Sequence, residues 1–154
     1  MKPQITFRPA TRDDLTAINR VISSAILNWP MSERARRLAV PVSQYDETDI
    51  GELELFVCVH RNEVIGVAAY NPEYCGKTGL LHGLYVLPIV QGQGIGKALM
   101  QEVFRAATAR EQTGVLVKAQ RVSAGYFEHC HLERVESAAN EYPYQYFKPV
   151  SDAA

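Results

Sequence analysis

The residues best suited to chemistry are three glycines at alternate positions, Gly92, Gly94 and Gly96. They lie between an apolar run typical of a strand and a segment with the apolar periodicity of a helix. The first N–H groups of a helix lack carbonyl partners and carry the positive end of the helix dipole. Glycine accepts positive φ and lets oxygen atoms approach the backbone without a Cβ in the way. The turn is therefore a candidate site for an anion such as a pyrophosphate; the alternative is an ordinary tight turn.

Two well-known phosphate-binding motifs differ from this turn. A Walker A motif has four residues between its glycines and ends in GK[ST], whereas here three residues separate Gly92 from Gly96, and Ala98 follows Lys97. The dinucleotide fingerprint GxGxxG requires its third glycine where Lys97 stands, and it normally opens a βαβ unit near the start of a parallel sheet. Both motifs are therefore excluded. An enzyme acting on nucleotide phosphates is only a weak alternative, because Lys97 lacks a Ser or Thr partner.

The helices that must position the turn are indicated by capping residues and prolines. A capping-box pattern at Thr11 and Asp14 starts a first helix, whose apolar positions reach Trp29 and which Pro30 ends. A second, short basic helix starts at Ser32 and ends near Pro41. Two further helices are expected, one from about Gly94 and one over residues 123–130.

The strands are expected where short runs are rich in β-branched and aromatic residues. Two such runs flank the turn Arg61-Asn62-Glu63, which predicts an antiparallel hairpin. Residues 44–52 carry four acids and few apolar side chains, so we interpret them as a loop. The expected strands cover residues 5–8, 55–60, 64–70, 80–86 and 115–119, a segment around residue 135, and residues 142–150. The resulting order is β-αα-βββ-α-β-α-ββ, a mixed α/β fold.

Length and composition predict a single domain over residues 1–150 with a flexible tail at residues 151–154. Among the 154 residues, 16 Lys and Arg nearly balance 17 Asp and Glu, so nucleic acid and acidic membrane surfaces are not expected as partners. The three cysteines are widely spaced and include no CxxC pair, which argues against disulfides and against a zinc site. No signal sequence or membrane-spanning apolar run is found, so we expect a cytoplasmic protein.

The strand, the glycine turn and the following helix together resemble a family signature. The segment Leu84-Tyr85-Val86-Leu87-Pro88, followed by Gln91-Gly92-Gln93-Gly94-Ile95-Gly96-Lys97-Ala98-Leu99, is similar to the signature of the GNAT superfamily of acetyl-coenzyme A-dependent N-acyltransferases. That signature is a strand ending in an LYV-like triplet, a proline, and then [QR]-x-x-G-x-[GA] opening a helix. The resemblance covers about residues 4–150 in topology and residues 80–100 in sequence detail.

The resemblance implies how acetyl-coenzyme A (acetyl-CoA) would be held. Its pyrophosphate would accept hydrogen bonds from backbone N–H groups of the turn, and Gln91 would add a side-chain contact. Its pantetheine arm would lie in a split between the fourth and fifth strands and pair with the backbone of Leu84 and Val86. Tyr85, between them, would point to the opposite face and is expected in the core. The implied N–H donors belong to Gln93, Gly94, Ile95, Gly96, Lys97 and Ala98.

The resemblance also implies that a neutral amine attacks the thioester directly, with a backbone N–H near Val86 as the oxyanion donor. The family commonly places a general base, often a carboxylate, upstream on the same strand, where this chain has Leu80. Strand alternation puts His82 on the face of Leu84 and Val86, so we predict that His82 is the base. An ordinary histidine pKa of about 6.5 suits proton removal at neutral pH. The alternative is a histidine that is merely hydrogen-bonded at the edge of the core.

The predicted proton donor for the departing thiolate is Tyr126. The family's short helix usually carries a Phe-Tyr pair whose hydroxyl lies near the coenzyme sulfur, and the matching pair here, Tyr126-Phe127, has the reverse order. A buried packing tyrosine is the alternative. The asparagine that frequently precedes this helix in the family is also absent, because Gln120 or Arg121 occupies its place.

Three further groups of residues could contribute to a site. His129, Cys130 and His131 invite a metal interpretation, but adjacent helical positions diverge and no fourth ligand is evident, so we expect a solvated helix end and no metal. A group of acids could attract a cationic amine or be a solvated loop. A group of aromatic residues could line the pocket that holds this amine, or could belong to the core. The acids are Asp46, Glu47, Asp49 and Glu52, and the aromatic residues are Trp29, Tyr142 and Tyr144.

Together these features predict an N-acetyltransferase that uses acetyl-CoA to acetylate a primary amine of a small molecule or an amino-acid-like acceptor. Its nearest variant is a protein N-acetyltransferase. A module that binds acetyl-CoA without efficient turnover is the alternative from another class, because the reversed Tyr126-Phe127 pair leaves the proton donor in doubt. Family habit suggests a homodimer. The acceptor is not identified, because this superfamily varies its substrate through loops.

Overall fold

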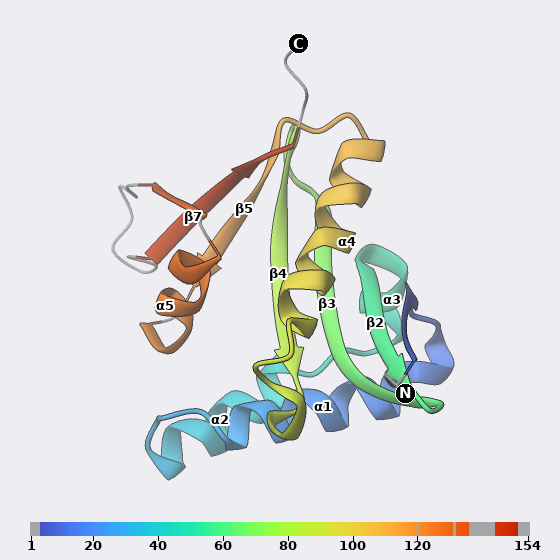
Figure 1. Ribbon diagram of the computed structural model, residues 1–154, viewed down its shortest axis with the longest axis vertical. Coiled ribbons are helices and arrows are strands. Elements are labelled where there is room, and N and C mark those ends of the chain that lie inside the picture. The colour runs from blue at the N-terminus through green and yellow to red at the C-terminus, as the bar shows by residue number, and fades with distance from the viewer. Residues whose placement is uncertain (1–3, 120, 131, 136–143, 151–154) are drawn as a thin grey trace.

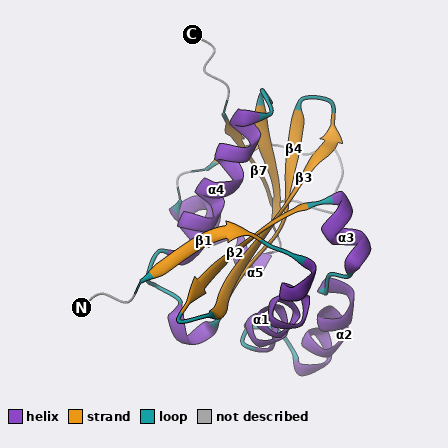
Figure 2. Ribbon diagram, turned by 90° about the vertical axis from the view of Figure 1, so that its right-hand side faces the viewer, coloured by secondary structure: helices purple, strands orange, loops and turns teal. Residues whose placement is uncertain are grey.

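The structure is a computed structural model that describes residues 4–119, 121–130, 132–135 and 144–150. A mixed β-sheet forms its centre. Helices α1 to α3 lie against one face of the sheet and α4 lies against the other (Figure 1, Figure 2). The strands are β1 (Ile5–Pro9), β2 (Glu54–His60), β3 (Glu63–Cys75), β4 (Thr78–Val86), β5 (Gly114–Ala119), β6 (Glu133–Val135) and β7 (Tyr144–Pro149). The helices are α1 (Leu15–Leu27), α2 (Glu33–Ser43), α3 (Glu47–Glu52), α4 (Ile95–Ala109) and α5 (Arg121–His129), with short 3-10 turns at Arg12–Asp14 and Pro88–Val90.

The described strands form one sheet in the order β1-β2-β3-β4-β5-β7-β6. Neighbouring strands are antiparallel, except that β4 and β5 are parallel. Parallel neighbours need a crossover connection, and α4 supplies it across one face of the sheet. The predicted mixed α/β class and order of elements are therefore confirmed, with α3 as an additional short helix.

Each face of the sheet has its own hydrophobic core. Beneath α4, Leu99 and Val103 are fully buried together with residues of β3, β4 and β5. Beneath α1, Ile18 and Ile22 are fully buried against β2 and β3. Because β3 is covered on both faces, all of its residues 64–70 are buried. Burial of each large aliphatic side chain contributes about 2 kcal/mol, so the two cores hold the helices firmly against the central strands.

The predicted starts of the first two helices are confirmed by their capping bonds. The Asp14 carboxylate accepts the backbone N–H of Thr11 at 2.7 Å and pairs with the Arg8 guanidinium at 2.8 Å. At the second start, Ser32 Oγ accepts the backbone N–H of Ala35 at 3.1 Å. These side chains satisfy donors that a helix start leaves without intrahelical partners.

The prediction of a loop over residues 44–52 is wrong, because a reciprocal capping box turns part of this segment into α3. The Asp46 carboxylate accepts the backbone N–H of Asp49 at 3.0 Å, and the Asp49 carboxylate accepts that of Asp46 at 2.8 Å. Ile50 packs against the core beneath α1. Two acids of the predicted solvated loop therefore cap a helix that packs the half-buried Ile50 against this core.

The ends of the first two helices differ from the prediction. Helix α1 ends at Leu27, so Trp29 lies in the connection to α2 and is not helical. The Arg36 guanidinium donates to the Trp29 carbonyl at 3.0 Å and fixes this connection. Helix α2 continues past its predicted end and contains Pro41 in its last turn. A proline there removes one ladder bond, which its N–H would have made to the Arg37 carbonyl, and only residues 42 and 43 of the helix follow it.

The predicted hairpin of β2 and β3 is confirmed. The two strands pair in antiparallel register, with His60 opposite Glu63. Between them Arg61 and Asn62 have φ values of 51° and 63°. Two central residues with positive φ are typical of the tight two-residue turns that match the twist of a hairpin.

Candidate functional site

Strands β4 and β5 pair along only part of their length. Residues 78–81 of β4 pair with residues 114–117 of β5, and the pairing ends there. Beyond that point β4 continues beside β3, while β5 continues beside β7. Figure 1 shows the two strands diverging toward the end of the molecule where α4 begins. The β5-side edge of β4 over residues 83–86 is therefore not paired with a described strand, and its backbone groups can pair with an extended ligand.

A β-bulge at His82 marks the point where the strands part. Gly83 pairs with Ala69 of β3, while Leu81 pairs with Tyr70, so His82 is the extra residue of β4. Leu81 and Leu84 both contribute to the core beneath α4, although three positions separate them. A bulge inserts one residue and so shifts the alternation of side chains between faces.

The prediction that His82 shares a face with Leu84 and Val86 is therefore wrong. Leu84 and Val86 pack against the core beneath α4. His82 Nδ1 instead lies 2.9 Å from the hydroxyl oxygen of Tyr45, which belongs to the core beneath α1. Tyr85 lies on this second face, as predicted, and its ring stacks on Trp29 with centroids 6.1 Å apart. The cause is the bulge, which simple strand alternation ignores.

The surroundings of His82 favour its neutral form. Partial burial lowers the pKa of His82, and the nearby carboxylate of Asp49 opposes this effect. Burial raises the pKa of Tyr45 above its ordinary value, so Tyr45 keeps its proton at neutral pH. The His82 ring keeps an exposed surface while its Nδ1 contacts Tyr45. A neutral imidazole with one nitrogen accessible can exchange a proton with a bound substrate.

The glycine turn leaves the start of α4 open. Gly92 and Gly94 have φ values of 83° and 80°, which favour glycine, and Gly94 is the N-cap of α4 without a side-chain cap. The first intrahelical bond runs from the Ala98 N–H to the Gly94 carbonyl at 3.0 Å. The N–H groups of the preceding helical residues have no carbonyl one turn back. They are donors available to an anion.

The space in front of the turn is empty of described atoms. A Cβ added to Gly92 or to Gly94 would meet no described heavy atom within 4 Å. Ile95 is buried in the core beneath α4, so it can offer a ligand only its backbone. The side chain of Gln91 donates to the Val86 carbonyl at 3.3 Å and ties the turn to the end of β4. Lys97, Gln93 and Gly94 are exposed, while Gly96 and Ala98 are half-buried.

Tyr126 lies beside this turn. A Cβ added to Gly96 would lie 2.6 Å from the Tyr126 hydroxyl and 3.7 Å from Val86 Cγ2, so the three residues meet in the first turn of α4. Phe127, in contrast, is buried and packs against Tyr146 with ring centroids 5.9 Å apart. In the reversed pair, Tyr126 therefore faces the site and Phe127 faces the core. Burial raises the pKa of Tyr126, and Cys130 adds to the effect, so the phenol stays protonated at neutral pH.

The other groups named from the sequence have different places. Glu47 pairs with Arg12 at 3.3 Å on the surface, and Asp46 and Asp49 cap α3. The structure brings only Asp49 of these acids into electrostatic reach of His82. Gln120, His131 and Tyr142 lie outside the described residues, as do the side chains of Arg121 and Tyr144. In the described part of the chain, no three His, Cys, Asp or Glu side chains gather as metal ligands, and no helix is long and apolar enough to span a membrane.

Sequence reasoning missed Tyr45, Asn19 and Gly83. Tyr45 is held by Asn19 of α1, whose side chain bonds both the carbonyl and the N–H of Tyr45 at 2.9 Å. A Cβ on Gly83 would lie 2.5 Å from the Tyr45 hydroxyl, so only glycine leaves room for it. One signal could have indicated the bulge, because a glycine inside a strand often marks a bulge or a close approach.

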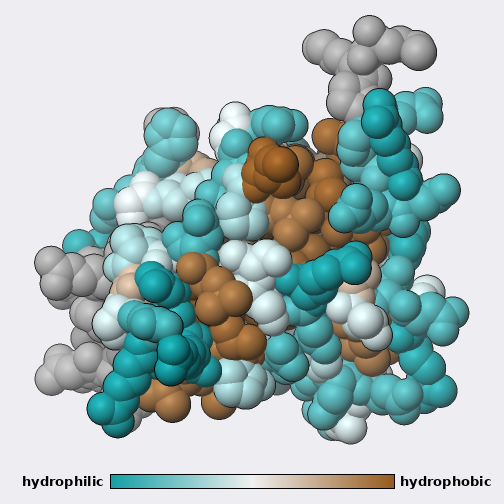
Figure 3. Space-filling model, turned by 90° about the horizontal axis from the view of Figure 1, so that it is seen from below, coloured by the Kyte–Doolittle hydropathy of each residue, from teal (hydrophilic) through white to brown (hydrophobic). Residues whose placement is uncertain are grey.

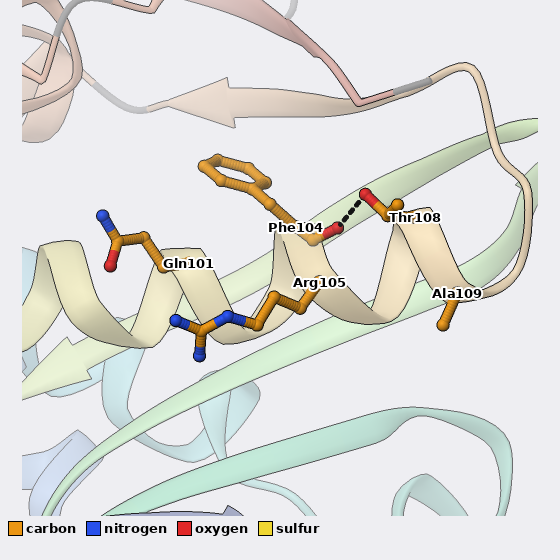
Figure 4. A pocket seen from close by; sticks show the side chains of 5 residues that line it. All are labelled: Gln101, Phe104, Arg105, Thr108 and Ala109. Carbon is orange, nitrogen blue, oxygen red and sulfur yellow. Dashed lines mark hydrogen bonds between the residues drawn. The ribbon is translucent and has the colours of Figure 1, made fainter. Parts of the chain in front are cut away.

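A surface depression of about 570 Å³ lies away from the glycine turn, on the outer side of α4. Figure 4 shows its five lining residues along the helix, with the Thr108 hydroxyl donating to the Phe104 carbonyl at 2.9 Å. Its charged side chain, Arg105, pairs with Glu102 at 2.6 Å. The lining offers no acid, histidine or cysteine, so we assign no chemistry to this depression.

Exposed apolar side chains lie in the 3-10 turn before the glycine turn and on α2. Ile89, in this 3-10 turn, is 86% exposed, and Leu38 and Val42 of α2 are also exposed. Figure 3 views the end of the molecule that carries α2 and the start of α4, and it shows apolar patches separated by polar side chains. This end of the molecule therefore has a surface of mixed apolar and polar character.

The family model described as the acetyltransferase (GNAT) family matches residues 21–132. This segment contains the bulge, the parted strands, the glycine turn and Tyr126. No curated protein sequence matches the chain.

Many solved structures share the fold. The PaiA N-acetyltransferase of Thermoplasma acidophilum, in complex with coenzyme A, has a TM-score of 0.82 and 15% identity, covering 95% of this chain and 99% of that chain. A GNAT family acetyltransferase from Brucella melitensis, in complex with acetyl-CoA, has a TM-score of 0.68 and 17% identity, with 96% and 89% covered. The ribosomal-protein-S18-alanine N-acetyltransferase from Escherichia coli has a TM-score of 0.67 and 17% identity, with 98% and 97% covered. At identities of 15% and 17%, the similarity to these structures shows a shared fold.

Proposed function

Since the chain belongs to the acetyltransferase (GNAT) family, we propose that it transfers the acetyl group of acetyl-CoA to a primary amine of a small molecule or an amino-acid-like acceptor. The family makes it an acetyl-CoA-dependent acetyltransferase. The observation that carries the proposal is the open, glycine-rich start of α4 beside the unpaired edge of β4.

The glycine turn suits the pyrophosphate of acetyl-CoA. Its N-cap, Gly94, has no side-chain cap, and the space that a Cβ would enter is free of described atoms. A pyrophosphate placed there would accept backbone hydrogen bonds at the positive end of the α4 dipole. Lys97 is exposed in the first turn of α4, where its cation would attract the same anion. The proposed donors are the N–H groups of Gln93, Gly94, Ile95, Gly96 and Lys97. The Ala98 N–H, which the resemblance also implied, already donates to the Gly94 carbonyl.

The end of β4 suits the pantetheine arm. The side chains of Leu84 and Val86 pack into the core beneath α4, so these residues offer a ligand their backbone groups. Residues 83–86 have no described strand on the side of β5. The amide groups of the arm would pair there as an added strand does. The N–H near Val86 would then donate to the developing oxyanion.

His82 is the proposed proton acceptor. Acetyl-CoA supplies a thioester whose carbonyl carbon a neutral amine can attack. Burial keeps His82 largely neutral at neutral pH, which is the form that can accept a proton. Because Nδ1 contacts Tyr45, the accepting atom would be Nε2. Nε2 takes the proton that the amine nitrogen loses when the N–C bond forms, directly or through a water, and then releases it to solvent.

Tyr126 is the proposed hydrogen-bond donor to the departing sulfur. Its hydroxyl lies against Gly96 and near Val86, where the split meets the start of α4. Because the pKa of Tyr126 is raised, complete transfer of its proton to a thiolate is unfavourable. Tyr126 would therefore stabilise the sulfur by donating a hydrogen bond as the C–S bond breaks, and the sulfur would take its proton from solvent.

The release of free thiol from acetyl-CoA, measured at steady state with a panel of amines, tests this proposal. The panel contains small amines, amino acids and peptides with free N-termini. We expect sustained turnover with at least one small amine or amino acid. His82→Ala should lower kcat/KM about 100-fold, as expected for loss of a general base. His129→Ala, at the exposed end of α5, is the matched control and should leave kcat/KM unchanged.

Each other outcome has a defined meaning. Binding of acetyl-CoA without turnover on any amine would replace the proposal with a binding module. Turnover only on peptides would replace the small acceptor with a protein N-terminus or side chain. Full activity of His82→Ala would remove His82 from the mechanism.

A further inference from the structure

The contact between Tyr45 and His82 determines which nitrogen of the histidine can act. The Tyr45 hydroxyl oxygen lies 2.9 Å from His82 Nδ1. A neutral imidazole carries one proton, and the nitrogen without it is the acceptor. If Tyr45 donates to Nδ1, the His82 proton is on Nε2, which then cannot accept another. If Nδ1–H donates to Tyr45, Nε2 keeps its lone pair.

Several described features build this contact. Tyr45 is 5% exposed, and its backbone is bonded twice by the Asn19 side chain at 2.9 Å. The bulge turns His82 toward Tyr45 and away from the face of Leu84. Gly83 makes room, because a Cβ there would lie 2.5 Å from the Tyr45 hydroxyl. The ring of His82 is thus held by a buried partner from the segment between α2 and α3.

We propose that Tyr45 is a positioning residue for the acetyl-transfer reaction, whose hydroxyl accepts a hydrogen bond from His82 Nδ1–H and so directs the lone pair of Nε2 to the acceptor amine. This inference rests on the proposed function of His82 as the proton acceptor. Tyr45 itself does not touch the reacting atoms in this account.

A phenol suits this role chemically. A hydroxyl has two lone pairs besides its hydrogen, so Tyr45 can accept from Nδ1–H while it keeps its own proton. When Nε2 takes the amine's proton, both ring nitrogens carry hydrogen, and the Nδ1–H bond to Tyr45 stabilises the imidazolium. The negative charge of Asp49 on α3 acts in the same direction, while burial opposes it. Tyr85, the other titratable group near Tyr45, keeps its proton because burial raises its pKa.

The first test is independent of turnover. Nitrogen NMR of the His82 ring in the purified protein reports the position of the proton and the pKa of the ring. We expect the Nδ1–H form in the wild type, and in Tyr45→Phe a shift toward Nε2–H with a pKa lower by about one unit, because the charged ring loses its acceptor. A wild-type ring protonated on Nε2, or a pKa that is unchanged or raised in Tyr45→Phe, would overturn the inference.

A second variant breaks the same contact without removing the hydroxyl. Gly83→Ala places a methyl group 2.5 Å from the Tyr45 hydroxyl and so pushes the hydroxyl away from His82, which should shift the His82 pKa in the same direction as Tyr45→Phe. Tyr70→Phe is the matched control, because it removes a buried hydroxyl from the core beneath α4 and not from the core of Tyr45. It should leave the His82 pKa unchanged. Circular dichroism on heating shows whether each variant is folded.

Kinetics then separate this inference from the proposed function. Tyr45→Phe should lower kcat/KM for the amine about tenfold, move the acidic limb of the pH profile to lower pH, and leave the KM for acetyl-CoA unchanged. Added to His82→Ala, Tyr45→Phe should have no further effect on kcat/KM. Normal activity of Tyr45→Phe alongside a 100-fold loss in His82→Ala would refute the role of Tyr45 alone. Absence of turnover in the wild type would refute the proposed function, while the NMR result would still decide the contact.

Discussion

Helices α2 and α4 begin in opposite ways, and the difference separates a structural helix start from a binding site. At α2, Ser32 closes the helix start by accepting the Ala35 N–H at 3.1 Å. At α4, Gly94 takes the N-cap position with a φ of 80° and provides no side-chain cap. Both helices have a dipole, but only α4 leaves its donors open beside the split between β4 and β5. A missing cap is a stability cost that a bound anion can offset.

Gly94→Trp should produce the largest effect. A bulky side chain would enter the space that is now free in front of the turn, and it would be strained at positive φ. We expect the affinity for acetyl-CoA to fall at least 100-fold, which corresponds to about 2.7 kcal/mol. Isothermal titration calorimetry measures it, with Ser32→Ala as the matched variant at the self-capped start. Equal affinities for Gly94→Trp and wild type would place the binding site elsewhere.

Gly96→Ala and Tyr126→Phe should have similar, intermediate effects on turnover. A Cβ at Gly96 would lie 2.6 Å from the Tyr126 hydroxyl and so would push it away, while Tyr126→Phe deletes it. We expect each to lower kcat about tenfold, because the departing sulfur loses a hydrogen-bond donor. Steady-state release of thiol at saturating acetyl-CoA measures this effect. A Tyr126→Phe enzyme with wild-type kcat would assign the hydroxyl to packing alone.

The 3-10 turn that precedes α1 offers a third case, in which the Asp14 carboxylate bonds the backbone N–H of Thr11 and makes stability depend on pH. Hydrogen bonds from Arg8 and from the Thr11 backbone lower the pKa of Asp14 to about 2. A lowered folded-state pKa means that the stabilisation is present above the unfolded-state pKa of about 4 and is lost as the pH falls toward 2. Because Arg8 is nearly half exposed, we expect only about 1 kcal/mol. Urea unfolding between pH 5 and pH 2 should show this loss in the wild type and a smaller one in Asp14→Asn.

Ser32→Ala should have the smallest effect and should be confined to stability. Loss of an exposed N-cap costs about 0.5 to 1 kcal/mol in the free energy of unfolding. Its affinity for acetyl-CoA should equal that of the wild type. Urea unfolding and calorimetry on the same preparation measure both quantities. Weaker binding of acetyl-CoA by Ser32→Ala would show that the start of α2 influences the site at the start of α4, which would contradict the comparison of the two helix starts.

Much of the fold could be predicted because its signals are local. The starts at Thr11 and Ser32, the turn at Arg61 and the helix after Gly94 each depend on residues within a few positions. The segment of α3 was misjudged because a pair of aspartates can form a capping box as well as a solvated loop. The half-buried Ile50 packs against the core beneath α1, and this tertiary contact favours the helix in a way that the local pattern does not show.

The candidate site was predictable where backbone conformation creates it and not where packing does. The glycine turn is visible in the sequence, because three alternate glycines stand between a predicted strand and a predicted helix. The side of the sheet on which His82 lies was not visible in the sequence, because one extra residue in β4 moves the following side chains to the opposite face. Tyr45 is 37 positions away in the chain and meets His82 only through the packing of the α2–α3 segment against β4. The role of Tyr45 in positioning His82 stays a prediction, as do the roles of His82 and Tyr126 in proton transfer and hydrogen bonding.

The most direct measurement is a calorimetric titration of the wild-type protein with acetyl-CoA and, separately, with S-acetylpantetheine, which lacks the pyrophosphate. If the open start of α4 holds the pyrophosphate, acetyl-CoA should bind with micromolar affinity and S-acetylpantetheine at least 100-fold more weakly. Equal affinities would show that the turn contributes nothing to binding. If acetyl-CoA did not bind, the proposal that the open start of α4 holds its pyrophosphate would be contradicted.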